Sequence, residues 1–327
     1  MDIRVLRAAD VRALLPMSEC IDLMQRTMIT VSQGGVVLPL RSLLVMPGDR
    51  GLMGNMSAYL AEPECFGVKL VSIMRHNKPP AYSSHLGIVM LFEAEHGQPV
   101  ALLDAAEITA IRTAAVSAVA TRLLARPDAG DLAIIGAGEQ ARSHLEAMLA
   151  VRSLRRIRVW ARDAVKAAAF AQREGARHRI TIETVPTVRE AVAGADIICT
   201  LTKAREPILL GDWLAPGTHL NVVGSSIASA AEIDTAAVLK ARFFVDYRDS
   251  TIHEGGEYLR ALNEGAIAPE HILAEIGEVA SGARAGRRSP NDVTLYKSLG
   301  IAPQDLAASH FVLERARASG AGAVIKF

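Results

Sequence analysis

The stretch Leu132-Ala-Ile-Ile-Gly-Ala-Gly-Glu-Gln-Ala141 decides the fold of this chain. An apolar run of strand type ends in Gly-x-Gly-x-x-Ala, and a helix-forming segment follows. In such a motif Gly136 makes the tight turn, Gly138 lets a phosphate approach the backbone, and the small Ala141 lets the helix pack closely on the strand. The helix N-terminus offers unpaired N–H groups to an anion. The pattern predicts a dinucleotide site, with a tight turn that binds nothing as the alternative.

Strands and helices alternate after this motif. Strand-like segments lie near residues 132–135, 158–161, 180–184, 196–200, 219–223 and 243–246, and most of them are followed by a helical segment. This alternation predicts an α/β fold with a Rossmann doubly wound parallel sheet. Ligands of such sheets bind beyond the carboxyl ends of the strands, which selects residues 136–140, 161–162, 200–203 and 223–226.

In the first third of the chain, strands and helices do not alternate in this way. Strand-like runs at 41–45, 52–60, 66–74, 85–92 and 100–104 follow one another with turn residues and no helix between them, which favours an antiparallel or mixed sheet. A long helix near 109–125 separates this part from the motif, and an amphipathic helix at 304–319 is expected to fold back onto it. We therefore predict a smaller α+β domain of residues 1–118 plus 304–327, and a dinucleotide-binding domain of residues 119–303.

The composition and net charge of the chain exclude some classes of function. The 327 residues are 50% hydrophobic and 22% charged, with a net charge of +1, so full cores are expected and nothing favours nucleic acid or an anionic membrane as a partner. No apolar run is long enough to span a bilayer, and the first residues lack a signal-peptide pattern. The three cysteines show neither metal-ligand nor disulfide spacing, so no metal is expected. We expect a cytoplasmic protein.

Three cations stand in apolar surroundings. Lys69 lies in the middle of a strand-like run, Arg112 lies near the start of a helix next to Thr113, and Arg41 lies in another apolar strand. A buried ammonium needs an anion or a lowered pKa, and a guanidinium suits a carboxylate or a phosphate. The alternatives are a lysine that reaches solvent at a sheet edge and an internal salt bridge of Arg112. Together with a dinucleotide site, the cations indicate hydride transfer to or from a small anionic substrate.

The second strand of the sheet bears on the choice of nucleotide. An acidic residue at its end would bind a ribose hydroxyl and favour NAD. Here Ala161 fills that position and Arg162 follows, which favours NADP because a guanidinium can pair with the 2′-phosphate. Arg162 stacking on adenine or facing solvent, and Asp163 reaching the ribose, remain alternatives, so the cofactor is NADP or NAD.

Several motifs together resemble those of the ornithine cyclodeaminase/mu-crystallin family. They are Phe66-Gly-Val-Lys69, Ile108-Thr-Ala-Ile-Arg-Thr-Ala-Ala115, Ile134-Ile-Gly-Ala-Gly-Glu-Gln-Ala141, Ala195-Asp-Ile-Ile198, Trp213-Leu-Ala-Pro-Gly217, Val223-Gly224 with Glu232-Ile-Asp234, and Thr294-Leu-Tyr-Lys-Ser-Leu-Gly300. The resemblance implies a homodimer whose subunits have a substrate and dimerisation domain and a Rossmann domain. It implies that Arg41, Lys69 and Arg112 hold the substrate carboxylate near the nicotinamide. It also implies cofactor contacts from Thr113, Gly138, Glu139, Gln140, Arg162, Thr200, Leu201 and Val223, beside the turn at Gly136.

One departure from the family pattern concerns the reaction. The cyclodeaminases have an aspartate two residues after the glycine of Val-Gly, and here that position is Ser226. A serine hydroxyl is not a general base near neutral pH unless another group activates it. Members with a non-acidic residue here resemble imine reductases, so we predict NAD(P)H-dependent reduction of a small α-imino acid to an L-amino acid. The alternatives are cyclodeamination of ornithine with catalytic NAD and a non-catalytic NADP-binding protein. Ser225 and Ser226 as helix caps are a further interpretation.

The substrate's side chain is less constrained by the sequence. The polar segment 75–85 carries Ser83, Ser84 and His85, which suit a second carboxylate such as that of iminosuccinate, the imine of aspartate, unless the segment is only a solvated hairpin. Cyclic imines are equally compatible. Lys69 is either a carboxylate ligand or the proton donor to the imine nitrogen.

Overall fold

The computed structural model describes residues 2–74 and 85–326, which form two compact units. The first unit is Met1–Thr113 with Ile301–Phe327, and the second is Ala114–Gly300. The boundary between them falls within the long helix α3, Ala105–Leu124. The roles that the sequence analysis gave to the two domains stay predictions.

A mixed sheet forms the centre of the first unit. Its strands run in the order β16-β1-β7-β6-β5-β4-β2, with β3 paired to β4, and only β1 and β7 pair in parallel. The predicted antiparallel or mixed sheet is thus confirmed. The elements are β1 (Asp2–Leu6), α1 (Ala8–Leu14), α2 (Met17–Ser32), β2 (Val36–Val37), β3 (Ser42–Val45), β4 (Gly51–Ala61), β5 (Glu64–Met74), β6 (His85–Phe92), β7 (Pro99–Asp104), α11 (Ala302–Ser319) and β16 (Ala323–Lys326).

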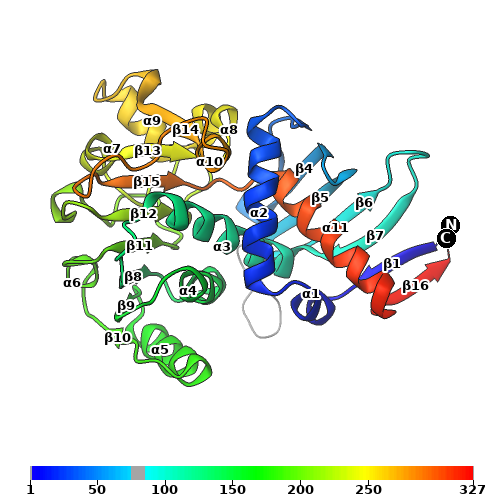
Figure 1. Ribbon diagram of the computed structural model, residues 1–327, viewed down its shortest axis with the longest axis horizontal. Coiled ribbons are helices and arrows are strands. Elements are labelled where there is room, and N and C mark those ends of the chain that lie inside the picture. Colours follow the sequence, from blue (N-terminus) through cyan, green and yellow to red (C-terminus); the bar gives the residue numbers. More distant parts are fainter. Residues whose placement is uncertain (1, 75–84, 327) are drawn as a thin grey trace. The chain divides into compact units, whose positions relative to one another are not determined.

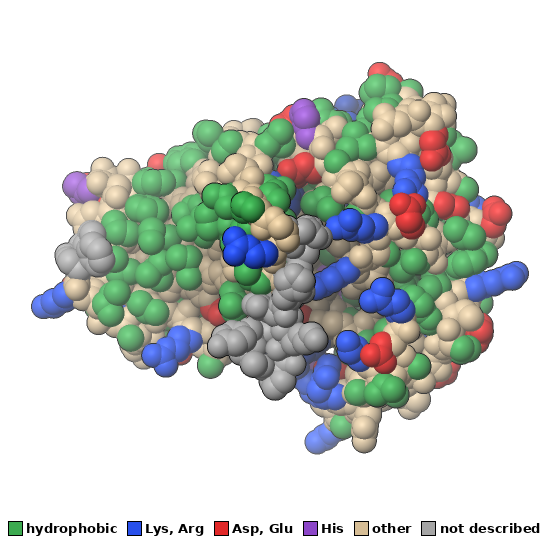
Figure 2. Space-filling view, turned by 180° about the vertical axis from the view of Figure 1, so that it is seen from behind, with side chains coloured by type: hydrophobic (Ala, Val, Ile, Leu, Met, Phe, Trp, Pro, Cys, Tyr) green, Lys and Arg blue, Asp and Glu red, His purple; other side chains and the backbone are tan. Residues whose placement is uncertain are grey.

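The two faces of this sheet differ. Helix α11 contacts β4, β5 and β6 on one face, and α2 packs against α11 (Figure 1). Strand residues alternate between faces, so Lys69 and its same-face neighbours point toward α11. The opposite face, which we call the outer face, carries Met53, Leu70, Leu86, Ile88 and Met90, and Figure 2 shows hydrophobic side chains gathered there. An exposed apolar area of this kind indicates an interaction surface.

A fully parallel sheet forms the centre of the second unit. Its order, β10-β9-β8-β11-β12-β15-β13-β14, places β8 at the point where the chain reverses direction across the sheet, which confirms the doubly wound Rossmann fold. The elements are β8 (Asp131–Ile135), α4 (Glu139–Val151), β9 (Arg156–Trp160), α5 (Ala164–His178), β10 (Glu183–Thr184), α6 (Val188–Val192), β11 (Ile197–Thr200), β12 (His219–Val222), α7 (Thr235–Lys240), β13 (Arg242–Val245), α8 (Arg248–Glu254), α9 (Gly256–Asn263), β14 (Ile272–Glu275), α10 (Ile276–Ala280) and β15 (Thr294–Lys297).

Burial on both faces explains why these strands are short apolar runs. Ala133, Ile198, Leu220 and Phe243 lie in one core with α6, α7 and α9, while alternate residues such as Ile134 are buried on the other face. Two strands of this sheet, β14 and β15, were not predicted, and neither were β1, β2 and β16 of the first unit. β15 contains a lysine. Because a buried lysine needs an anionic partner, which the sequence does not identify, this residue argues against a buried strand. Among the described residues, no helix has the length and apolarity needed to cross a membrane.

Candidate functional site

The turn after β8 has the geometry that its sequence predicts. Gly136 has a φ of +131°, and a Cβ there would lie 2.7 Å from the carbonyl oxygen of Leu201, so only glycine fits. Gly138 is the N-cap residue of α4, with a φ of −96°. No side chain in the described part of the chain caps this helix, so its first N–H groups remain available to a ligand.

Two observations fit a bound dinucleotide. A Cβ added to Gly138 would meet no atom of the described residues within 4 Å, so packing within the protein does not explain this glycine, whereas the close approach of a pyrophosphate does. On the first turn of α4, the side-chain oxygen of Gln140 is buried and has no hydrogen-bond partner among the described residues. A buried acceptor without a partner is costly, so a ligand donor is expected to satisfy it.

The remaining predicted cofactor residues of the second unit lie along the same edge of the sheet. Leu201 N–H donates to the Ile135 carbonyl at 2.8 Å, and Val223 N–H donates to the Thr200 carbonyl at 3.1 Å, so these segments follow adjacent strands. Glu139 is exposed and pairs with Arg142. In the first unit, Thr113 is buried, and its hydroxyl has no hydrogen-bond partner within residues 2–74 and 85–326.

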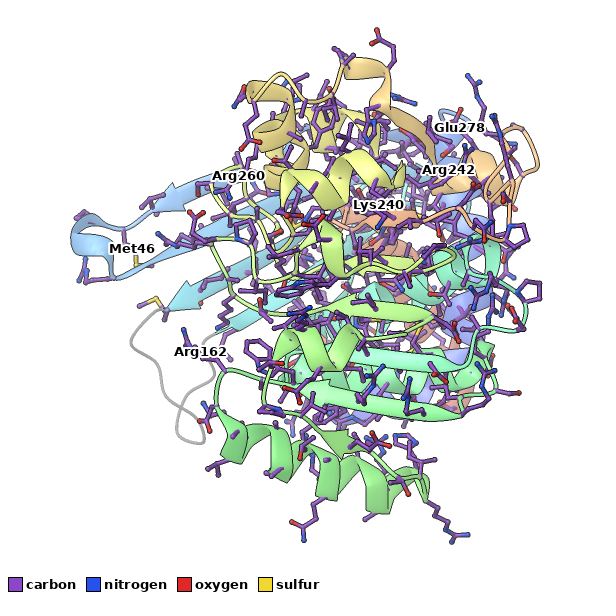
Figure 3. The ribbon with its side chains drawn as sticks, turned by 90° about the vertical axis from the view of Figure 1, so that its left-hand side faces the viewer. Met46, Arg162, Lys240, Arg242, Arg260 and Glu278 are labelled. Carbon is purple, nitrogen blue, oxygen red and sulfur yellow. The ribbon has the colours of Figure 1, made fainter. Side chains whose placement is uncertain are left out.

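The end of β9 separates the two nucleotide alternatives. Arg162 is exposed just beyond the strand and has no hydrogen bond or ion pair with any described residue (Figure 3). Asp163 is the N-cap residue of α5, and its carboxylate accepts from the N–H groups of Val165 at 3.0 Å and Lys166 at 3.3 Å. Since that carboxylate is already used as a cap, the geometry disfavours a role for it at the ribose.

Ser225 and Ser226 differ in their surroundings. Ser225 is buried, donates to Glu257 and accepts from Lys297 Nζ at 2.8 Å. Ser226 is half-buried, and its hydroxyl has no partner among the described residues, so it remains available to a ligand. The cap interpretation is wrong for both, because no helix begins here and the next helix, α7, is capped by Asp234.

A buried ionic network holds the segment around Ser225. Lys297 Nζ lies 2.7 Å from Glu257 Oε2, and both side chains are fully buried. Lys297 also donates to the Ser225 carbonyl at 2.5 Å. Nearby, Glu232 accepts from Gly224 N–H and from Thr202 N–H, each at 2.7 Å, and burial raises its pKa. The network fixes the backbone of the segments that follow β11 and β12.

In the first unit, two of the predicted substrate cations converge on one carboxylate. Lys69 Nζ lies 2.8 Å from Asp305 Oδ2, and Arg112 Nε donates to Asp305 Oδ1 at 2.9 Å. Arg112 Nη1 also donates to Gln304 Oε1 at 2.6 Å, and Lys69 Nζ donates to Thr109 Oγ1 at 3.4 Å. Lys69 lies on β5 between β4 and β6, with a buried side chain, which excludes the edge-strand alternative. The internal salt bridge of Arg112 is present, and it does not neutralise the cluster.

The charges of this cluster do not balance. Lys69 and Arg112 carry two positive charges against one on Asp305, and Arg41 adds positive potential. Burial lowers the pKa of Lys69 from 10.5 to about 8; Asp305 opposes this change, while Arg112 and Arg41 contribute to it. A buried excess of positive charge attracts an anion, and the cluster can therefore bind a carboxylate.

Asp305 and Gln304 were not predicted from the sequence. Both are fully buried in the first turns of α11, among Leu306, Ala307 and Ala308. An aspartate within an otherwise apolar helix segment was a usable signal, but its partners lie far away in the sequence. Ser83 and Ser84, proposed for a second carboxylate, lie outside the described residues, and of His85 the structure gives only its place as the first residue of β6.

A separate cavity offers no comparable chemistry. It has a volume of about 420 Å³ at the amino end of β13, the opposite edge from Arg162 (Figure 3). Its lysine, Lys240, donates to the carbonyls of Gly211 and Leu214, and its arginine, Arg242, donates to that of Gly286. The described residues contain no group of three or more His, Cys, Asp or Glu side chains placed to hold a metal ion.

Comparisons with known proteins agree with this geometry. The model of the ornithine cyclodeaminase/mu-crystallin family matches residues 1–320. The ketimine reductase mu-crystallin of Mus musculus is 39% identical over 281 residues, which are 86% of each chain. The Δ(1)-pyrroline-2-carboxylate reductase of Thermococcus litoralis, in complex with NADH and L-proline, has a TM-score of 0.94 at 35% identity, covering 98% of this chain and 99% of that one. An archaeal alanine dehydrogenase dimer with bound NAD has a TM-score of 0.93 at 28% identity over 100% of both chains.

Proposed function

Because the chain belongs to the ornithine cyclodeaminase/mu-crystallin family, we propose that it reduces a small α-imino acid to an L-amino acid with NADH or NADPH. The observation that carries the proposal is the buried cluster of Lys69, Arg112 and Asp305, whose excess positive charge suits the carboxylate of such a substrate. The phosphate-binding turn at Gly136 and Gly138 supports the dinucleotide half of the reaction.

In this proposal Arg112 and Arg41 bind the substrate carboxylate, and Lys69 is the proton donor. The guanidinium of Arg112 donates to Asp305 and Gln304 through Nε and Nη1, and its Nη2 group, which has no partner among the described residues, can bind the substrate. The bound nicotinamide supplies hydride to the imine carbon. Lys69 holds a proton close to the imine nitrogen, and its pKa of about 8 suits an acid that donates near neutral pH.

The strands around Lys69 favour a substrate with an uncharged side chain. Met56 and Val89 lie directly across from Lys69 on β4 and β6. The next row on the same face is Gly54, Val71 and Gly87. None of these residues offers a charge for a second carboxylate. A cyclic imine such as Δ1-pyrroline-2-carboxylate therefore fits better than iminosuccinate, and the T. litoralis relative is a Δ(1)-pyrroline-2-carboxylate reductase.

We also propose that the protein prefers NADPH and forms a homodimer. In support, Arg162 is exposed just beyond β9 with no partner among the described residues, where a guanidinium could pair with a 2′-phosphate, while the Asp163 carboxylate caps α5. The outer face of the first sheet exposes Ile88 and Leu86, and burying it against a second copy would remove its apolar surface from water. The archaeal alanine dehydrogenase relative is a dimer.

Ser226 disfavours cyclodeamination, because the acid of the family pattern is absent there and no described residue bonds to the serine hydroxyl to activate it.

The test is a screen of Δ1-pyrroline-2-carboxylate, Δ1-piperideine-2-carboxylate, iminosuccinate formed from oxaloacetate and ammonia, and pyruvate with methylamine, each with NADH and NADPH. The proposal expects oxidation of the dinucleotide with at least one cyclic imine. Binding of the dinucleotide without turnover of any imine contradicts it. Formation of proline and ammonia from ornithine, with no net change in NAD, supports cyclodeamination instead.

A further inference from the structure

We propose that Asp305 is a positioning residue of the reaction, which holds Lys69 as the ammonium ion and fixes the guanidinium of Arg112 for the substrate carboxylate. This inference rests on the proposed function and adds to it a residue that does not itself touch the substrate. Asp305 is the only carboxylate that the described residues bring within ion-pair distance of Lys69 and Arg112.

The contacts of Asp305 assign one oxygen to each cation. Oδ2 lies 2.8 Å from Lys69 Nζ, and Oδ1 accepts from Arg112 Nε at 2.9 Å. The carboxylate is fully buried, and both cations are at least 96% buried. Since the two oxygens are about 2 Å apart in one rigid group, these contacts also fix the separation and direction of the two cations.

Helix α11 holds the carboxylate in place. Asp305 lies in its first turn, where the helix dipole favours a negative charge. The neighbouring Gln304 donates to Met28 Sδ at 3.4 Å and accepts from Arg112, which ties the start of α11 to α2 and α3. The carboxylate is thus on a rigid element, as precise positioning of two cations requires.

The charges that face Lys69 come from three segments. Within residues 2–74 and 85–326, Asp305 on α11 is the only anion that acts on Lys69, Arg112 on α3 and Arg41 before β3 are cations, and Thr109 on α3 is neutral. Asp305 raises the pKa of Lys69, whereas burial and the two arginines lower it. Without the carboxylate, Lys69 would lose its proton at a lower pH and would no longer serve as the proton donor.

The test compares Asp305→Asn with Asp305→Glu, a matched pair that separates charge from geometry. In the wild type, kcat/KM for the imine found in the screen is expected to fall above about pH 8, as Lys69 deprotonates. This fall is the alkaline limb of the pH profile, and in Asp305→Asn we expect the limb to lie at a pH about one to three units lower. In Asp305→Glu the limb stays near its wild-type position while KM rises, because the longer side chain displaces both cations.

An unchanged limb in Asp305→Asn overturns the proposal, since a merely structural role lowers activity equally at every pH. If Asp305→Asn does not fold, Asp305→Glu decides alone, and wild-type kcat and KM in that variant overturn the proposal.

If the wild type reduces no imine, the proposed function has failed, but the inference is still tested by urea unfolding. The destabilisation caused by Asp305→Asn should then become smaller as the pH rises from about 6 to about 8. Over this range the native variant has lost the Lys69 proton, whereas the native wild type still binds it. A constant difference overturns the inference.

Discussion

The two glycines of the phosphate-binding turn should respond to alanine in opposite ways. Gly136 is required by the fold, since its φ is +131° and an added Cβ would lie 2.7 Å from a backbone oxygen. Gly138 has a φ of −96°, which alanine adopts readily, and an added Cβ would meet nothing within 4 Å in the described part of the chain. The structure therefore attributes the first glycine to folding and the second to ligand binding.

The expected magnitudes follow from these distances. Gly136→Ala should destabilise the protein by about 1–3 kcal/mol through backbone strain, which lowers the Tm by about 2–4 °C per kcal/mol. Gly138→Ala should leave the stability of the free protein within about 1 kcal/mol of wild type, since alanine restricts the unfolded chain but is a poorer N-cap residue than glycine. Its methyl group would occupy space needed by the pyrophosphate, at a cost of about 1–3 kcal/mol, which raises Kd by about 5- to 150-fold.

The assay is isothermal titration with NADH and NADPH, together with thermal and urea unfolding of the ligand-free proteins. The expected pattern is a stable Gly138→Ala that binds dinucleotide poorly, beside a Gly136→Ala whose defect is seen already without ligand. Wild-type affinity in Gly138→Ala would refute the reasoning, because the space beside that residue would then not hold the pyrophosphate.

Four further predictions concern other parts of the molecule. Lys69→Met should lower kcat/KM for the imine by about 100- to 10,000-fold, as expected for loss of a general acid, while dinucleotide affinity in titration stays within about two-fold. Arg162→Ser should weaken NADPH binding by about 10- to 150-fold and NADH binding much less; equal losses would contradict pairing with the 2′-phosphate. Ile88→Lys should give monomers in sedimentation velocity, whereas Leu239→Lys, also at an exposed apolar residue, should leave the mass unchanged. His144→Gln should make the acid side of the stability profile less steep. Burial lowers the pKa of His144 from 6.5 to about 4, so the native state resists a proton that the unfolded chain accepts. As pH falls from 6.5 to 4, urea unfolding should show a loss that is smaller in the variant by about 1.4 kcal/mol per pH unit, while His219, whose pKa burial lowers to about 3, contributes equally in both proteins.

The features that could be predicted from the sequence are those whose cause is local. The turn at Gly136 and Gly138 follows from steric requirements within a few residues, and helix α11 was predicted at 304–319 against an observed Ala302–Ser319. Lys69 could be singled out because a lysine within an apolar strand needs an explanation. The family and the Rossmann sheet were predicted from such local signals and are confirmed.

The features that could not be predicted depend on partners distant in sequence. Arg112 and Asp305 are 193 residues apart, and nothing local to either residue identifies the other. Strand β15 was missed for the same reason, since Lys297 is compatible with a buried strand only because Glu257 neutralises it. The interpretation of Ser225 as a helix cap is wrong because its hydroxyl bonds to this distant pair, which the sequence does not reveal.

The most direct test of the central claim follows the hydride itself. The protein is incubated with reduced dinucleotide carrying deuterium at C4 and, in parallel reactions, with Δ1-pyrroline-2-carboxylate or Δ1-piperideine-2-carboxylate, and the products are analysed by NMR and chiral chromatography. We expect at least one of the two imines to give its L-amino acid with deuterium at Cα, and loss of that product in Lys69→Met. Recovery of both imines unreduced, by a protein shown in titration to bind the dinucleotide, would contradict the proposed reaction.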